Sequence, residues 1–182
     1  MSASEIQLPV PPDYGHALDP LLRACGSIAD APRLDAALRA ACAAAVDALG
    51  FHHAAAVVLE SRGTQATVAA EHPARGTEGA HIPLNDLSVL QGAARSRVPL
   101  QVGDALADPA LQALRPLLEA AGIRAVLALP ILRGERLLGW LSVHDTQAPR
   151  AFTPADVSRG QMLARQLGPL VENDRLREQA RT

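Results

Sequence analysis

Two apolar runs separated by a polar turn predict a β-hairpin late in the chain. Residues 124–145 read RAVLALPILRGERLLGWLSVHD, and Gly134-Glu135 suits a two-residue type II′ turn with glycine at its first central position. Neither strand has a face with a run of charge, so we expect both faces to be covered. The turn predicts these opposed pairs: Pro130 with Gly139, Ala128 with Leu141 and Val126 with Val143 on one face, and Leu129 with Trp140, Leu127 with Ser142 and Ala125 with His144 on the other.

The second strand of this hairpin carries polar side chains at alternate positions. Side chains two residues apart point to the same face of a strand, so Trp140, Ser142 and His144 should project together from a stretch otherwise built of Leu, Val and Gly. Buried polar groups need hydrogen-bonding partners, and a bound ligand is one way to supply them. This spacing predicts that the three residues line a pocket.

The remaining apolar patterns predict a mixed set of helices and strands. A helical stripe at intervals of three and four residues runs through residues 32–49, and period-two or continuous apolar runs indicate short strands elsewhere. The expected helices cover residues 19–30, 32–49, about 85–95, 108–122 and 154 onward, and the expected strands cover 52–60, 65–72, 81–84 and 98–104.

Capping signals mark where these helices begin. Asp19 followed by Pro20 predicts the start of the first helix, and Thr153 followed by Pro154 predicts the start of the last one. Pro116 lies inside the helix expected at 108–122 and should kink or split it. Residues 1–18 are rich in Pro and Ser, which predicts a flexible leader before a single domain.

Composition narrows the class of protein. Of 182 residues, 48% are hydrophobic and 20% charged, which is enough apolar material for a core. The net charge is −2, and all 17 basic residues are scattered arginines, so we expect no binding to nucleic acid or to a membrane. The Lys-free, Ala- and Arg-rich composition suggests a GC-rich bacterial genome. No segment resembles a signal peptide or membrane span, so we expect a cytoplasmic protein.

The order and spacing of these elements resemble the GAF domain family over residues 19–176. The matching stretches are LDAALRAACAAAVDALGF, AAAVVLE, HIPLND, VPLQVGD, AGIRAVLALPIL, LLGWLSVHD and AFTPADVSRGQMLARQL. The resemblance implies an α+β fold, GAF/PAS-like, with a central antiparallel sheet of five to six strands. It also implies terminal helices on one face, short helices and a ligand pocket on the other, and a homodimer formed through the terminal helices. Residues 177–182 would be the charged end of the last helix.

The resemblance adds candidate ligand contacts to those of the hairpin. His81, Asp86 and Ser88 lie where GAF domains commonly contact ligands, although Asp86 or Ser88 would equally serve as a helix cap. Arg124 begins a strand and suits a carboxylate or phosphate, or else is a solvated charge at the strand end. His144 has its own alternative, as a strand-end histidine bonded to Asp145 or water. Leu127, opposite Ser142 in the predicted register, completes the expected site.

We expect neither a metal nor a prosthetic group in this pocket. The six histidines form no cluster with zinc spacing, and His52 and His53, adjacent on a strand, should point to opposite faces. Aromatic residues make up only 2%, too few to stack on a haem or bilin. The residue pattern of cyclic-nucleotide GAF domains includes a lysine, which this chain lacks.

The resemblance predicts a bacterial sensory domain that binds an unidentified small molecule and signals occupancy through its terminal helices to a partner protein. One alternative is a ligand-free dimerisation or interaction module. Another is an enzyme similar to GAF-fold methionine sulfoxide reductases, which use cysteines around the pocket. Cys25 and Cys42 fall on the first two helices as small buried residues, so we expect no enzyme activity.

Overall fold

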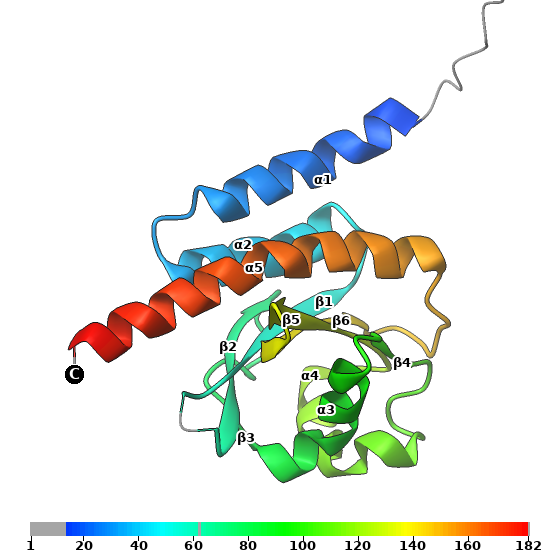
Figure 1. Cartoon of the computed structure of the whole chain (residues 1–182). Coiled ribbons are helices and arrows are strands. Elements are labelled where there is room, and N and C mark those ends of the chain that lie inside the picture. Colours follow the sequence, from blue (N-terminus) through cyan, green and yellow to red (C-terminus); the bar gives the residue numbers. More distant parts are fainter. Residues whose placement is uncertain (1–13, 62, 182) are drawn as a thin grey trace, which may run out of the picture.

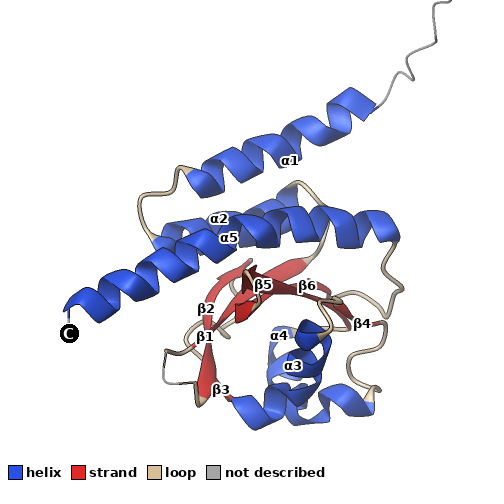
Figure 2. Ribbon diagram, viewed as in Figure 1, coloured by secondary structure: helices blue, strands red, loops and turns tan. Residues whose placement is uncertain are grey.

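The computed structural model describes residues 14–61 and 63–181. One six-stranded sheet lies between two helical layers (Figure 1). Two of the longer helices, α2 (Leu34–Asp47) and α5 (Pro154–Arg181), cover one face of the sheet, and two short helices, α3 (Ser88–Arg95) and α4 (Arg115–Ala121), cover the other (Figure 2). A further helix lies outside the first helical layer. The predicted α+β architecture, with terminal helices on one face and short helices on the other, is confirmed.

The sheet is antiparallel throughout, with the strand order β3-β2-β1-β6-β5-β4. Its strands are β1 (His53–Leu59), β2 (Gln65–His72), β3 (His81–Pro83), β4 (Leu100–Val102), β5 (Ala125–Arg133) and β6 (Arg136–Asp145). The chain therefore builds one half of the sheet from β1 to β3 and the other from β4 to β6, and β1 and β6 join the halves at the centre.

In the described part of the chain, five α-helices and two 3-10 turns surround this sheet. They are α1 (Tyr14–Ala29), α2 (Leu34–Asp47), η1 (Leu84–Leu87), α3 (Ser88–Arg95), η2 (Pro109–Leu114), α4 (Arg115–Ala121) and α5 (Pro154–Arg181). Helices α2 and α5 lie on one face, and α1 packs on their outer side (Figure 1). The segments η1–α3 and η2–α4 cover the opposite face.

The last helix begins at its predicted cap. Thr153 Oγ1 accepts the N–H of Asp156 at 3.1 Å, and Asp156 Oδ2 accepts the N–H of Thr153 at 2.9 Å, which completes a capping box. Pro116 splits its helix as expected, into the 3-10 turn η2 and the helix α4. The predicted start of the first helix was wrong, because α1 begins at Tyr14 and contains Pro20. Residues 14–18 of the predicted leader are therefore helical, and residues 1–13 lie outside the described residues.

The hairpin of β5 and β6 forms with the predicted two-residue turn, but its predicted register was wrong by one residue. Arg133 pairs with Arg136 across the turn, yet Ile131 pairs with Gly139 because Leu138 is an extra, bulged residue in β6. Every pair beyond the bulge is shifted: Pro130 lies opposite Trp140, Ala128 opposite Ser142, and Val126 opposite His144. A one-residue shift exchanges the faces of β5 relative to β6.

The bulge coincides with close contacts that tie β6 to its neighbours. A Cβ atom on Gly139 would lie 2.1 Å from the carbonyl oxygen of Val57 on β1, so only glycine fits between the two strands. Arg175 on α5 donates to the carbonyl of the bulged Leu138 at 3.5 Å and also to that of Leu59. Burial lowers the pKa of Arg175. Its guanidinium supplies hydrogen bonds to a carbonyl at the bulge and to one at the end of β1.

Helix α5 lies unusually close to the sheet through two glycines. A Cβ atom on Gly160 would lie 2.5 Å from a methyl carbon of Leu129, and one on Gly168 would lie 2.2 Å from the carbonyl oxygen of Leu132. Ala164, between them on the same helical face, is also buried. No helix in the described part of the chain combines the length and the apolar character needed to cross a membrane.

We predict that Gly168→Ala destabilises the protein by about 1–3 kcal/mol, because the added methyl group meets a strand backbone that cannot give way. In an open helix the same change would stabilise by up to about 1 kcal/mol. Gly92→Ala in α3 is the matched control, since its Cβ would have nothing within 4 Å. Urea unfolding of both variants measures the two effects, and a stabilising Gly168→Ala would contradict the close packing of α5.

Candidate functional site

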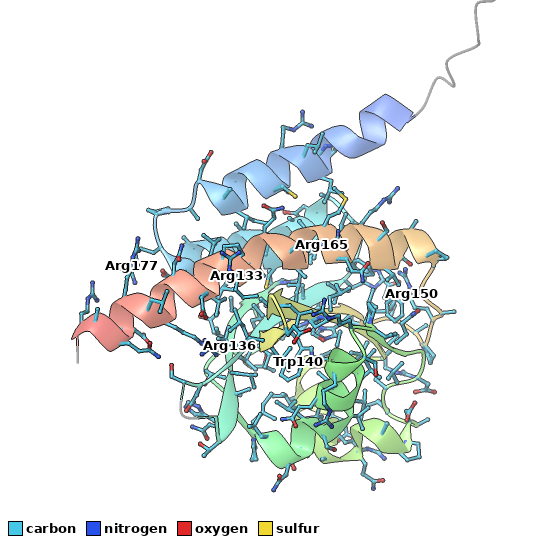
Figure 3. The ribbon with its side chains drawn as sticks, viewed as in Figure 1. Arg133, Arg136, Trp140, Arg150, Arg165 and Arg177 are labelled. Atoms are coloured by element: carbon cyan, nitrogen blue, oxygen red, sulfur yellow. The ribbon has the colours of Figure 1, made fainter. Side chains whose placement is uncertain are left out.

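A small cavity lies between the sheet and the short helices α3 and α4. Its volume is about 60 Å³, and its walls are almost wholly apolar. Figure 3 places Trp140 on this side of the sheet, below the ribbon of β6. The cavity is lined by His53, Ala55, Val57, Val68, Thr77, Ile82, Leu87, Leu90, Leu111, Leu114, Leu117, Leu118, Ile123, Val126, Trp140, Ser142 and His144.

The two central strands position the polar end of this cavity. His53 on β1 lies opposite His144 on β6, and Ala55 lies opposite Ser142 in the same ladder. The next pair on this face joins Val57 and Trp140. Period-two alternation therefore brings the residues of both strands to one surface. Trp140, Ser142 and His144 all line this cavity, as their alternate spacing predicted.

Four side chains form a continuous hydrogen-bonded chain across the sheet. Ser142 Oγ lies 2.7 Å from His144 Nε2, and His144 Nδ1 lies 2.9 Å from His53 Nδ1. His53 Nε2 then lies 3.1 Å from Glu71 Oε2 on the neighbouring strand β2. All four residues are buried, and the two imidazole rings are stacked with centroids 5.1 Å apart.

The loop after β2 holds the carboxylate at the end of this chain. Glu71 Oε1 accepts the backbone N–H groups of Arg75, Gly76 and Thr77 at 2.9, 2.8 and 3.0 Å, and that of Glu78 at 3.3 Å. The Thr77 hydroxyl donates to Oε2 at 2.6 Å. Successive N–H groups that converge on one oxygen stabilise a buried negative charge.

This environment keeps the carboxylate at one end of the hydrogen-bonded chain ionised and the two imidazoles in its middle neutral. Burial by itself would raise the pKa of Glu71, but the bonds from Thr77, Arg75 and His53 outweigh it and lower the pKa to about 2. Burial lowers the pKa of His144 well below its usual value, and the neighbouring His53 and Arg75 lower it further. The pKa of His53 is also lowered by burial, against the opposing effect of Glu71.

Three of the predicted site residues lie away from the cavity lining. His81 is exposed on β3 and contacts Thr67 Oγ1 at 3.1 Å and Glu60 Oε1 at 3.2 Å, because it alternates with Ile82, which does line the cavity. Asp86 is half-buried and Ser88 is exposed, and the neighbouring Leu87 and Leu90 face the cavity instead.

Neither alternative role for Asp86 or Ser88 as a helix cap is observed. The N-cap of η1 is Pro83 and that of α3 is Leu87, and neither cap makes a side-chain hydrogen bond. The leucines of this segment, not its polar residues, face the sheet.

Arg124 and Leu127 also do not line the cavity. The backbone of Arg124 joins the sheet, where its N–H donates to the carbonyl of Asp145 at 2.8 Å, while its buried Nε has no partner among the described residues. Leu127 belongs to the core beneath the terminal helices, together with Leu141 and Val143. The bulge at Leu138 causes this reversal, since it moves Leu127 off the face of Ser142.

Sequence reasoning missed His53, Glu71 and Thr77. The alternation of His53 with Ala55 and Val57 was visible, but β1 is apolar on both faces and gives no sign of which face holds the pocket. A glutamate inside the apolar strand β2 was the strongest overlooked signal, because a buried carboxylate requires several donors. Its donors come from a loop, which no periodicity reveals.

Both cysteines lie away from this cavity, and no metal-binding group is found among the described residues. Cys42 is buried in α2 on the opposite side of the sheet, where its Sγ donates to the carbonyl of Ala70 at 3.8 Å and burial raises its pKa to about 12. Cys25 lies on α1 and packs against the same core. Within residues 14–61 and 63–181, His, Cys, Asp and Glu side chains form no group of three that could hold a metal ion.

Comparison with known proteins gives a consistent family assignment. The family model described as GAF domain matches residues 33–169, which is most of the chain. A comparison with curated proteins gives no significant match.

Solved structures of low sequence identity share the fold. The GAF domain of a phosphoenolpyruvate-protein phosphotransferase from Coxiella burnetii is 18% identical, with a TM-score of 0.79 over 91% of this chain and 98% of that one. The blue-light absorbing form of the PixJ GAF domain of Thermosynechococcus elongatus is 19% identical, with a TM-score of 0.65 over 88% and 92%. The protein JSC1_58120g3, solved in its far-red absorbing dark state with bound biliverdin IXa, is 19% identical, with a TM-score of 0.71 over 85% of this chain and 98% of that one.

We predict that Glu71→Ala lowers the free energy of unfolding by about 3 kcal/mol at about pH 7, the value that a pKa lowered from 4.5 to about 2 represents. A carboxyl group whose pKa is lower in the folded protein stabilises the fold at pH values above its unfolded pKa. This stabilisation is lost as the pH falls toward its folded pKa. The difference between the unmodified protein and the variant should therefore shrink between about pH 4.5 and about pH 2.

Urea unfolding at several pH values measures this difference. Glu78→Ala removes an exposed carboxylate that pairs with Arg39, and it should cost at most about 1 kcal/mol. Equal losses for Glu71→Ala and Glu78→Ala would contradict the buried role assigned to Glu71.

Proposed function

The chain belongs to the GAF domain family, and we propose that it is a sensory signalling domain that binds a small molecule in the cavity beneath β1 and β6. The observation that carries this proposal is the cavity itself, which has apolar walls and one polar end formed by Ser142, His144 and His53. A mostly apolar pocket with a few convergent polar groups is the usual form of a small-molecule site.

The sheet offers a direct path from the cavity to the terminal helices. Trp140, Ser142 and His144 face the cavity, whereas Leu141 and Val143, between them on β6, pack into the helix-side core. A ligand that shifts β6 must therefore act on that core. Such a shift needs only a difference in ligand affinity between two packings of the helices.

The contacts of α5 suit it to receive such a shift. Its glycines Gly160 and Gly168 lie against β5 without side chains to cushion the contact. Farther along α5, Glu172 accepts from Arg136 of β6 at 3.0 Å, and Arg175 binds the bulged Leu138. Because these contacts leave little slack, small movements of the hairpin should displace the helix.

Two observations support a ligand other than a bilin. Both cysteines lie on the side of the sheet covered by α2 and α5, away from the cavity. Apart from the two imidazoles, Trp140 is the only aromatic ring among the lining residues. The same cysteine placement supports a binding function over a thiol-dependent reductase, since Cys42 is buried and its raised pKa keeps it as an inert thiol. We therefore propose a non-enzymatic domain.

The second candidate is a ligand-free dimerisation or interaction module. Leu22 on α1 and Leu176 on α5 are exposed by 57% and 53%, and both belong to the helices that the family resemblance assigns to a homodimer. Burial of these leucines against a second copy would remove that apolar surface from water. Sedimentation of the unmodified protein tests this candidate, and a monomer at high concentration would contradict it.

We predict that Ala55→Leu abolishes small-molecule binding while the protein stays folded. Ala55 lines the cavity opposite Ser142, and the three added carbon atoms would fill the empty volume. Ala120→Leu, an exposed position on the cavity-covering helix α4, is the matched control and should bind as the unmodified protein does. Native mass spectrometry for a copurified molecule, followed by calorimetry with a metabolite panel, measures binding.

Hydrogen exchange provides the signalling readout. Ligand should change the protection of amides in α5 and α2 of the unmodified protein and of Ala120→Leu, and should leave Ala55→Leu unchanged. Binding without any change in the terminal helices would contradict transmission, and binding retained by Ala55→Leu would place the ligand elsewhere.

A further inference from the structure

The hydrogen-bonded chain from Glu71 to the cavity has a fixed direction, and we infer from it the chemical class of the ligand: a small, uncharged, mainly apolar molecule that donates one hydrogen bond to Ser142 Oγ, such as an alcohol. This inference rests on the proposed function, because it concerns the same cavity. It follows from the geometry of four side chains and not from the fold.

The direction is set at the Glu71 end. An ionised carboxylate is only an acceptor, and Glu71 Oε2 lies 3.1 Å from His53 Nε2, so His53 must carry its hydrogen on Nε2. A neutral imidazole has one hydrogen, which leaves His53 Nδ1 as an acceptor. His144 Nδ1 lies 2.9 Å away and must therefore be the donor in that pair, since two lone pairs at this distance would repel.

The same reasoning carries the direction to the cavity. With its hydrogen on Nδ1, neutral His144 has only a lone pair at Nε2, so the Ser142 hydroxyl donates its hydrogen to Nε2 across 2.7 Å. His144 is the only hydrogen-bond partner of Ser142 Oγ among the described residues. Ser142 therefore presents oxygen lone pairs to the cavity and no hydrogen, and a molecule bound there must supply the donor.

Charge and size restrict the ligand further. His53 and His144 are the only titratable residues that line the cavity, and Glu71 behind them is negative. Arg75, whose charge lowers the pKa of both histidines, does not line the cavity and donates to the Ala121 carbonyl at 3.0 Å. An anion would thus be buried without a partner, which is costly. The volume of about 60 Å³ is less than half of the roughly 150 Å³ that accommodates benzene in a dry protein cavity.

Three molecules of nearly equal size test the direction of the chain. 2-Propanol can donate a hydrogen bond, acetone can only accept one, and acetate is an anion. Ligands of this size bind weakly, so NMR titration of the Ala55 and Ser142 amides at millimolar ligand is the appropriate measurement. We expect 2-propanol to bind roughly tenfold more tightly than acetone or acetate, the effect of one hydrogen bond gained against one unpaired group.

The variant Glu71→Gln should reverse this preference. Its amide oxygen must take the Oε1 position, because the N–H groups of Arg75, Gly76 and Thr77 require an acceptor there. The amide NH2 then faces His53 Nε2 and donates to it. The hydrogen of His53 moves to Nδ1 and that of His144 moves to Nε2, so the Ser142 hydroxyl accepts from His144 and turns its own hydrogen into the cavity.

In Glu71→Gln, acetone should therefore bind at least as tightly as 2-propanol. Glu78→Gln neutralises an exposed carboxylate that pairs with Arg39 and leaves the backbone N–H that donates to Glu71 in place, so it should keep the preference of the unmodified protein. If Glu71 served stability alone, the variant would bind all three molecules more weakly, and the order of the affinities for acetone and 2-propanol would not change.

Several outcomes would overturn the inference. Equal or tighter binding of acetone or acetate by the unmodified protein would do so, as would an unchanged order of preference in Glu71→Gln. Failure of all three molecules to bind would also overturn it. If Glu71→Gln does not fold, the comparison of the three ligands on the unmodified protein decides. A metabolite that binds through a carboxylate would refute this inference and leave the proposed sensory function intact.

Discussion

The Glu71 carboxylate, buried in β2, accepts hydrogen bonds from successive backbone N–H groups of the loop that follows it, and this interaction orders the whole polar end of the cavity. Because the loop keeps the carboxylate ionised, His53 has one allowed tautomer, His144 has one in turn, and the hydroxyl of Ser142 has one direction. A protonated or missing carboxylate would leave both imidazoles free to exchange their roles.

The rest of the architecture holds these residues in reach of one another. The central ladder of β1 and β6 brings His53 opposite His144, and it depends on Gly139, whose missing side chain admits the backbone of β1. On the other face, Gly160 and Gly168 let α5 lie directly on β5. The sheet therefore has close contacts with α5 on one face and a small cavity beside the other.

Membership of the GAF family explains the layout, and the three structural neighbours described above, 18–19% identical, share this fold. The walls of the cavity include six leucines of the short segments η1–α3 and η2–α4. Its polar lining residues are His53 on β1, Thr77 in the loop after β2, and Ser142 and His144 on β6. The small volume and the absence of a cation among the lining residues both favour a neutral ligand of few atoms over a large or anionic one.

The sequence by itself determined the order of helices and strands, the hairpin turn, the capping box at Thr153 and the face of β6 that carries Trp140, Ser142 and His144, because each of these depends on periodicity or on residues close in the chain. Tertiary structure alone decided the register of β5, which the bulge at Leu138 shifted, and with it the burial of Leu127 under the terminal helices. It also decided that Glu71 joins the site, since a buried charge is stable only where donors from elsewhere in the fold converge on it.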